Sequence, residues 1–150
     1  RNFPSGIFEK NLQVCIMKIN YDLSGKNGSL PLIPVPHDCI VEHITETENA
    51  VSFEFSADVC EYDSVRAMGL NFHGLTISVN LSDPTFFIYE KKKSGSKIKE
   101  IFDAEDFREK ICGKKLEYLN HFVNENDFVV VLSDYILAFT AYSVEFDWKE

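Results

Sequence analysis

The sequence predicts an all-β protein, an antiparallel β-sandwich of the jelly-roll kind with one short helix in an insertion. The 150-residue chain is 45% hydrophobic and contains thirteen Phe and six Tyr, enough to fill the core of one domain. Short apolar or alternating segments recur along it, separated by Gly, Pro and Asn. About nine or ten short strands with turns of this kind are typical of a sandwich.

The first half of the chain contains four expected strands. Residues 1–10 are predicted to be a lead-in, and 22–36 a loop, because its three prolines exclude a helix and disfavour a central strand. The clearest strand, 51–55, alternates so that Phe53 lies on an apolar side and Glu54 on a polar side. The expected strands of this half are 11–19, 39–44, 51–55 and 64–68.

The second half adds one helix and further strands. Asp103 can cap a helix over 103–112 in which Phe107 and Ile111 share one face. Asn124 to Asp127 has the composition of a hairpin connection. The expected strands of this half are 75–81, 86–89, 118–123, 128–133 and 137–146.

Composition predicts one domain over 1–150, with a core from about 15 to 146, and excludes some partners. The longest apolar run, Phe128 to Leu132, is far shorter than the ~20 residues of a membrane span. A net charge of −9 argues against nucleic acid and favours basic protein surfaces or cations. The lysines from Lys91 to Lys99 surround Ser94-Gly95-Ser96 and are interpreted as a solvated turn, in preference to a patch for anionic glycans.

Cysteines and glycosylation sequons indicate an extracellular setting. The cysteines, an even number, are compatible with three disulfide pairings. Asn27 and Asn80 each begin an N-glycosylation sequon. Together these features predict a secreted protein or the ectodomain of a membrane protein. The four cysteines are Cys15, Cys39, Cys60 and Cys112.

Motifs for catalysis are absent from the sequence. There is no GxSxG elbow, no glycine-rich loop opening a helix and no HExxH. His37 and His43, which flank Cys39, are expected on the surface or in packing roles, and an enzyme is not expected, although carboxylate pairs for a glycosidase cannot be judged from spacing. The histidines are His37, His43, His73 and His121.

Three acids are candidate calcium ligands. Calcium prefers several oxygen ligands. Glu54 lies on the polar side of its strand, Asp63 follows Cys60, and Asp134 ends the most apolar strand. Strand ends that are distant in sequence can meet at one edge of a sandwich, so a shared site is conceivable.

The order of these elements resembles that of a CUB domain, an extracellular β-sandwich module. The resemblance runs from about Cys15 to Phe146. It rests on four features that occur in the order typical of the family. Two cysteines flank a loop with Gly and Pro, and an apolar strand is followed by Cys-x-Tyr-Asp. A Cys-Gly pair comes next, and then an apolar strand that ends in Ser-Asp and is followed by aromatic residues. The segments concerned are Cys15–Cys39, Phe53–Val65, Cys112-Gly113 and Val130–Tyr142.

This resemblance implies disulfides, a metal and a kind of partner. It implies the bridges Cys15–Cys39 and Cys60–Cys112, and calcium held by Glu54, Asp63 and Asp134. Since Glu54 is six residues before Cys60, one more than usual in the family, Asp58 is an alternative ligand. In such domains the acidic site receives a Lys or Arg of a partner protein.

The sequence therefore predicts an extracellular protein–protein interaction or adhesion module that is calcium-dependent and binds a basic side chain. The alternative is a lectin-like carbohydrate-binding domain in which an exposed Tyr or Trp148 stacks on a sugar. A purely structural domain is a further alternative.

Overall fold

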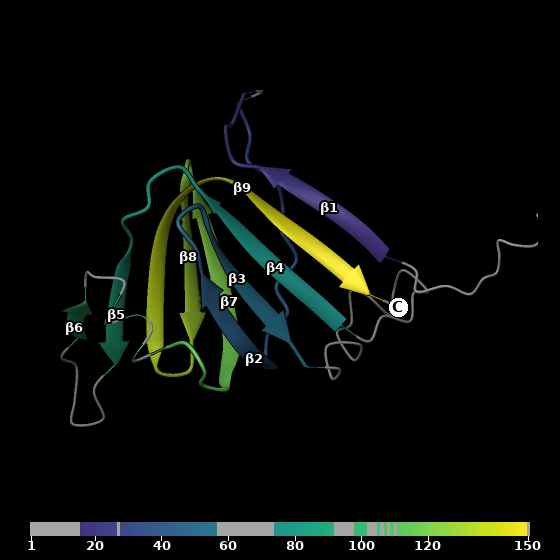
Figure 1. The fold of residues 1–150 in the computed structure, drawn as a ribbon. Helices are drawn as coiled ribbons and strands as arrows, with labels where there is room; N and C mark the ends of the chain where they lie inside the picture. Colours follow the sequence, from purple (N-terminus) through teal and green to yellow (C-terminus); the bar gives the residue numbers. More distant parts are fainter. Residues whose placement is uncertain are drawn as a thin grey trace, which may run out of the picture.

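A closed antiparallel β-barrel forms the centre of the structure, a computed structural model (Figure 1). The structure describes residues 16–26, 28–56, 74–91, 98–101, 105, 107, 109 and 111–149. All elements formed by these residues are strands.

Six strands close the barrel in the order β4-β3-β2-β7-β8-β9, and β9 pairs with β4 to complete it. Two three-stranded meanders, β2-β3-β4 and β7-β8-β9, are joined through the pairings β2–β7 and β4–β9. The strands are β2 (Cys39–Glu46), β3 (Ala50–Phe55), β4 (Gly74–Leu81), β7 (Leu116–Asn124), β8 (Asp127–Leu132) and β9 (Tyr135–Lys149).

Strand β9 is the longest strand and has a different set of neighbours along each half. Its first half pairs with β8 and with β5 (Phe87–Lys91), which in turn pairs with β6 (Ile98–Ile101). Its second half pairs with β4 and with β1 (Ile16–Asp22), which lies beside it in Figure 1. Between the halves Asn80 pairs with Ser143 but Leu81 pairs with Ala141, so Tyr142 is an extra residue. A bulge of this kind turns a strand.

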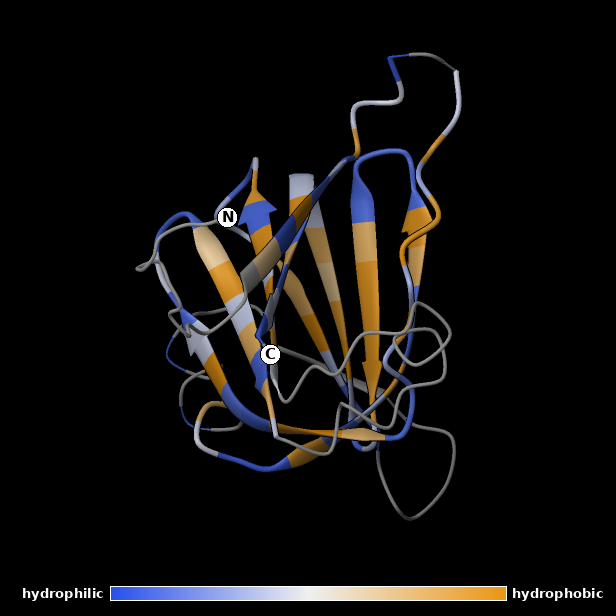
Figure 2. Cartoon of the chain, turned by 90° about the vertical axis from the view of Figure 1, so that its right-hand side faces the viewer, coloured by the Kyte–Doolittle hydropathy of each residue, from blue (hydrophilic) through white to orange (hydrophobic). Residues whose placement is uncertain are grey.

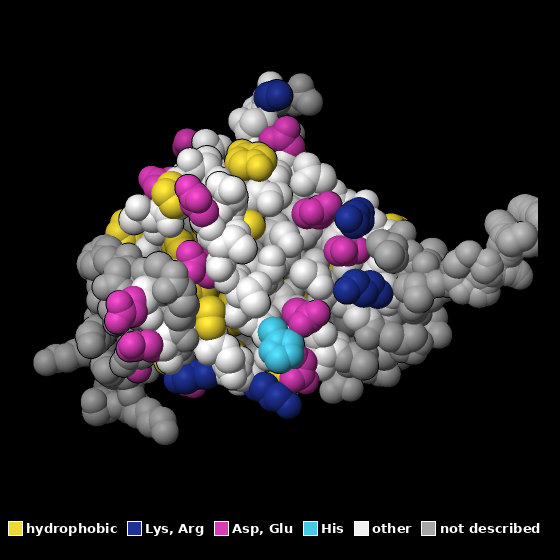
Figure 3. Space-filling model, viewed as in Figure 1, with side chains coloured by type: hydrophobic (Ala, Val, Ile, Leu, Met, Phe, Trp, Pro, Cys, Tyr) yellow, Lys and Arg dark blue, Asp and Glu magenta, His cyan; other side chains and the backbone are white. Residues whose placement is uncertain are grey.

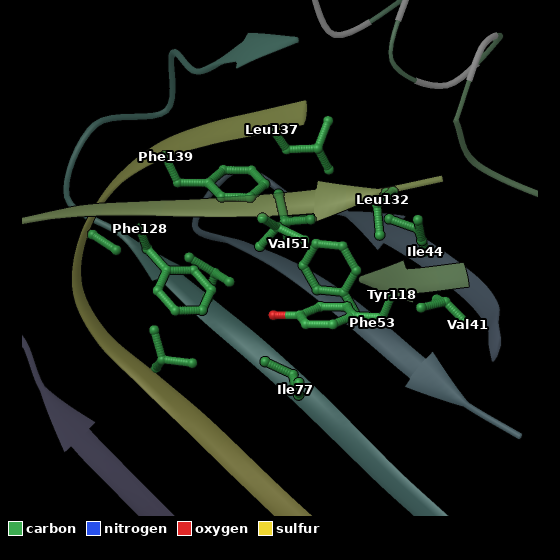
Figure 4. Close-up of a cluster of buried hydrophobic side chains, with 14 of the residues drawn as sticks. Val41, Ile44, Val51, Phe53, Ile77, Tyr118, Phe128, Leu132, Leu137 and Phe139 are labelled. Atoms are coloured by element: carbon green, nitrogen blue, oxygen red, sulfur yellow. The ribbon is translucent and has the colours of Figure 1, made fainter. Parts of the chain in front are cut away.

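The barrel interior is filled by apolar side chains from all six strands. Phe53, Tyr118 and Phe139 come together there with edge-to-face ring contacts, as the close-up in Figure 4 shows. Because side chains in a strand alternate, every second residue of β3, β4 and β8 is buried, whereas register shifts in β2 and β7 interrupt the alternation. In β9 the buried set shifts from odd to even positions after the bulge, so that Phe146 and Trp148 also face the interior.

The closed barrel shows that the predicted jelly-roll sandwich was wrong. The local strand pattern is similar in both folds, but closure depends on the pairing of β9 with β4, whose paired residues are at least 60 positions apart in sequence. The predicted last strand, 137–146, is shorter than β9, which continues to Lys149. These additional residues pair along β4 and help to close the barrel.

The predicted helix over 103–112 is not an element of the fold in the described part of the chain. Backbone of helical conformation occurs there at Glu105, Phe107 and Glu109, and the Ile111 amide donates to the Phe107 carbonyl at 2.9 Å. Phe107 and Ile111 are buried, and the Phe107 ring packs against Phe86. This short segment contributes to the core.

Most predicted strands are confirmed with small changes at their ends. The segments expected at 39–44, 51–55, 75–81, 86–89, 118–123 and 128–133 overlap β2, β3, β4, β5, β7 and β8. The segment 11–19 overlaps β1 only from residue 16, and β6 was not predicted. The strand expected at 64–68 and the lead-in at 1–10 lie outside the described residues.

Candidate interaction surface

The candidate calcium ligands that the structure describes lie on different elements. Glu54 is exposed on the outer surface of β3, beside His43 of β2 and Thr76 of β4. Asp134 is exposed in the turn between β8 and β9, where its carbonyl accepts a hydrogen bond from the Lys91 amide. Asp63 and its neighbour Asp58 lie outside the described residues.

Glu54 lines an open cavity of about 310 Å³ at one end of the barrel. Asp134 is not part of this cavity, whose lining also includes His43 and Lys149. Within the described ranges, no group of three or more His, Cys, Asp or Glu side chains is arranged to hold a metal ion. The calcium site that needs Asp63 stays a prediction.

The predicted disulfides involve cysteines beyond the described part of the chain. Cys39 begins β2 and Cys112 lies in the turn before β7, and both are half-buried against the core. No disulfide joins these two described cysteines to each other. Cys15 and Cys60, their expected partners, lie outside the described residues.

The described glycosylation sequon begins in the middle of the sheet. Asn80 of β4 is half-buried, and its Nδ2 donates to Ser143 Oγ at 2.9 Å. A glycan would be attached at this same nitrogen and would leave it one hydrogen to donate. Asn27, the other predicted acceptor, is outside the described residues.

Trp148, the residue predicted to stack on a sugar, is buried. Its side chain is 1% exposed and its ring packs against Phe146 in the interior. The carbohydrate-binding alternative therefore loses its best candidate. Tyr142, at the bulge of β9, is exposed.

One outer surface of the barrel is apolar, which the sequence did not lead us to expect. On it the side chains of β7, β8, the first half of β9, and β5 align in two rows because cross-strand partners share a face. The first row is Phe122–Val129–Ala138–Phe87, and the second is Asn120–Val131–Ile136–Tyr89. We call its apolar members the apolar face: Phe87, Tyr89, Phe122, Val129, Val131, Ile136 and Ala138.

The aromatic side chains at the two sides of the apolar face are the most exposed. Phe122 is 57% exposed and Phe87 is 41% exposed. The rings of Phe87 and Tyr89 are stacked, with centroids 6.5 Å apart. The aliphatic residues between Phe122 and Phe87 are half-buried. The face is therefore a continuous hydrophobic surface with an aromatic residue on each flank, unlike single scattered hydrophobic residues.

Acidic residues cluster at one end of the apolar face. Asp127 and Glu125 are exposed at the β7–β8 turn, which lies against β9 through a bond from the Ala141 amide to the Asn126 carbonyl. Asp83 is exposed in the connection from β4 to β5, whose Ser82 amide donates to Thr140. The opposite end has charges of both signs, from Lys91, Lys114 and Asp134.

The sequence contained a signal for this surface. Every residue of the run Phe128 to Leu132 is apolar. Because neighbouring side chains of a strand point to opposite sides, apolar side chains must lie on the outer side of this strand as well as in the interior. Residues 135–139 repeat this pattern. The length of the first run predicts a strand but does not indicate what its outer side contacts.

Comparison with protein-family models, curated proteins and solved structures gives no match. The resemblance to a CUB domain thus stays a hypothesis, and the sandwich that it implies is not observed. In the described part of the chain there is no helix with the length and hydrophobicity needed to cross a membrane.

Proposed function

We propose that this domain is a protein-binding module without enzymatic activity that docks a partner protein on the apolar face. The observation that carries the proposal is the continuity of the two rows across β7, β8, β9 and β5. Apolar surface of this extent, with aromatic anchors, is characteristic of the buried centre of protein–protein interfaces. The cysteines and sequons of the sequence favour an extracellular setting.

The partner we propose has an apolar centre and basic residues facing Asp83, Glu125 and Asp127. These acids are exposed at one end of the apolar face, where they can pair with Lys or Arg at the rim of an interface. A second copy of this chain fits less well, because each copy carries a net charge of −9 and would repel the other.

Selection from a random peptide library displayed on phage tests this proposal without a known partner. The wild-type chain is the bait, and selected peptides are then measured for affinity to a Phe87→Ser/Phe122→Ser double variant. Because aromatic residues dominate interface energies, we expect affinity to fall at least about tenfold. We also expect enrichment of apolar and basic residues in the peptides, and weaker binding to Glu125→Gln/Asp127→Asn.

Leu32→Ser is the matched control. Leu32 is 96% exposed, but it lies in the connection between β1 and β2 and not on the apolar face. We expect this variant to bind selected peptides as the wild type does. Peptides that bind the double variant as tightly as the wild type, or a failure to enrich any peptide, would count against the proposal. Thermal unfolding of each variant verifies that it is folded.

A further inference from the structure

A buried histidine links the connection between β1 and β2 to the barrel. His121 of β7 is 6% exposed, and its Nε2 lies 2.9 Å from the carbonyl oxygen of Ile33. Ile33 is buried as well. We call residues 28–38 the Ile33 segment. The Asp38 amide, which donates to the Tyr118 carbonyl at 2.7 Å, anchors the end of this segment.

The two hydrogen bonds of His121 define which nitrogen carries the proton. A carbonyl oxygen can only accept, so Nε2 must be protonated to donate to Ile33. In a neutral ring Nδ1 is then an acceptor, and the Tyr118 hydroxyl, 2.7 Å away, donates to it. The neutral ring therefore satisfies both of its nitrogens.

A second proton on His121 would break the present hydrogen bond between the ring and Tyr118. It would sit on Nδ1 and face the Tyr118 hydroxyl, which would have to turn its own proton away. Tyr118 is fully buried and its ring contacts Phe53 and Phe55, so this reorientation would take place inside the packed interior. The charged imidazolium would also be poorly solvated.

The described groups that contact His121 carry no charge. Tyr118 comes from β7 itself, the Phe128 ring from β8 lies 5.0 Å away between centroids, and the Ile33 segment contributes a carbonyl. Burial lowers the pKa of His121 below its ordinary 6.5, and the bond to Ile33 opposes this change. No described carboxylate among these contacts offsets the cost of charging the ring.

We propose that the Ile33 segment is a pH-sensitive strap, closed over the barrel when His121 is neutral and released when it is protonated. Release exposes the ring to water and removes the conflict at Tyr118. Pro31, Pro34 and Pro36 have no amide hydrogen, so they cannot add backbone donors that would hold the segment. The Ile33–His121 bond lies between these prolines and is the middle attachment of the strap.

The sign of the effect follows from the lowered pKa. The open form titrates near 6.5 and the closed form below it, so the closed form has its full stability above pH 6.5. As the pH falls from 6.5 to the lowered pKa, the ratio of open to closed rises about tenfold for each pH unit. Below the lowered pKa it becomes constant.

Amide hydrogen exchange of the whole chain at about pH 7.5 and about pH 5, corrected for intrinsic rates, measures this opening. In the wild type we expect the amides of Asp38 and Cys39, which donate to the carbonyls of Tyr118 and Pro36, to lose protection at the lower pH. In His121→Gln, which is neutral at both, they should exchange with equal protection. His43→Gln removes an exposed histidine and is the control, which should behave as the wild type does.

Tyr118→Phe provides a second variant in case His121→Gln does not fold. It removes the donor to Nδ1, which stabilises the neutral ring, so the pKa of His121 in the closed form rises towards 6.5. The closed form is then less stable at neutral pH, and the change in protection between the two pH values becomes smaller. Nitrogen NMR of the imidazole reports the tautomer and the titration directly. A proton on Nδ1 of the neutral ring, equal protection of the wild type at both pH values, or a transition that persists in His121→Gln would each overturn the proposal.

Discussion

The two outer surfaces of the barrel differ in chemistry although they cover one continuous interior. The apolar face lies outside β7, β8, the first half of β9 and β5. The second surface, which we call the polar face, lies outside β2, β3, β4, the second half of β9 and β1. Its rows are Thr45–Ser52–Ser78–Glu145–Asn20 and His43–Glu54–Thr76–Asp147–Lys18.

Figures 2 and 3 show the same contrast. In Figure 2 some strands alternate between orange and paler or blue segments, whereas others are orange along most of their length. In Figure 3 the surface over β3, β4 and the second half of β9 is mostly white, magenta and dark blue. Short polar pairs such as Ser52 and Ser78, whose hydroxyls are 3.2 Å apart, cover this side.

Strand β9 carries both surfaces, which shows that the difference is not imposed by the fold. Before the bulge its outward residues include Ile136 and Ala138, and after it they are Glu145 and Asp147. The inward residues are apolar in both halves. Since the interior is satisfied by the inward set alone, the outward apolar residues need another explanation, and partner binding provides one.

The largest effect we predict separates interior from exterior on a single strand. Val130 of β8 is fully buried, whereas the adjacent Val129 belongs to the apolar face. Val130→Asp places a carboxylate without a partner in the interior and should lower the free energy of unfolding by about 3–5 kcal/mol. Urea unfolding monitored by fluorescence measures this change.

Val129→Asp is the matched variant and should lower the free energy of unfolding by only about 1 kcal/mol, because the new carboxylate meets water. If both variants were equally damaging, the outer surface would be part of the core and the comparison between the faces would fail. If Val129→Asp folds normally but abolishes binding of the selected peptides, the distinction becomes sharper.

A smaller effect is expected within the polar face. Asn80→Ala removes the donor to Ser143, whose hydroxyl is on a residue only 4% exposed, and should cost about 1–2 kcal/mol of unfolding free energy. Ser78→Ala breaks the contact with the half-buried Ser52, which can turn to water, so its cost should be about 0.5 kcal/mol. Thermal unfolding of protein made without glycosylation compares the two, and an equal cost would mean that burial of Ser143 is irrelevant.

Local pattern predicted the strands, but pairing between distant strands decided the fold. Val51 to Phe55 was predicted correctly in extent and in the direction of its side chains, because alternation is a property of adjacent residues. The pairing of β4 with β9 leaves no local signal, whereas the shift of phase at Tyr142 is visible in the alternation of Val144 to Lys149. β6 was missed because it lies next to a lysine-rich segment interpreted as a solvated turn.

The candidate site was predictable to a smaller extent. Glu54 and Asp134 were placed correctly on a polar strand side and at a strand end, since both properties are local. Whether acids converge depends on tertiary structure, and the resemblance to a sandwich family supplied an expectation that the barrel does not share. His121 belongs to no short metal-binding motif in the sequence, and nothing local indicates that it is buried with two specific hydrogen bonds.

The smallest effect is predicted at the edge of the polar face, where β1 ends. Asp22 Oδ1 accepts a hydrogen bond from the Ser24 amide at 2.8 Å, and this bond lowers the pKa of the Asp22 carboxyl below its ordinary 3.8, with a lesser contribution from Lys26. A lowered pKa means that the stabilisation is present above pH 3.8 and is lost as the pH falls through the folded value. Asp22→Ala should therefore lower the melting temperature slightly near neutral pH and converge with the wild type in acid. Asp22→Asn retains an oxygen acceptor and should lie between them, whereas an Asp22 carboxyl that titrates in NMR at or above 3.8 would show that the turn does not bind its charged form.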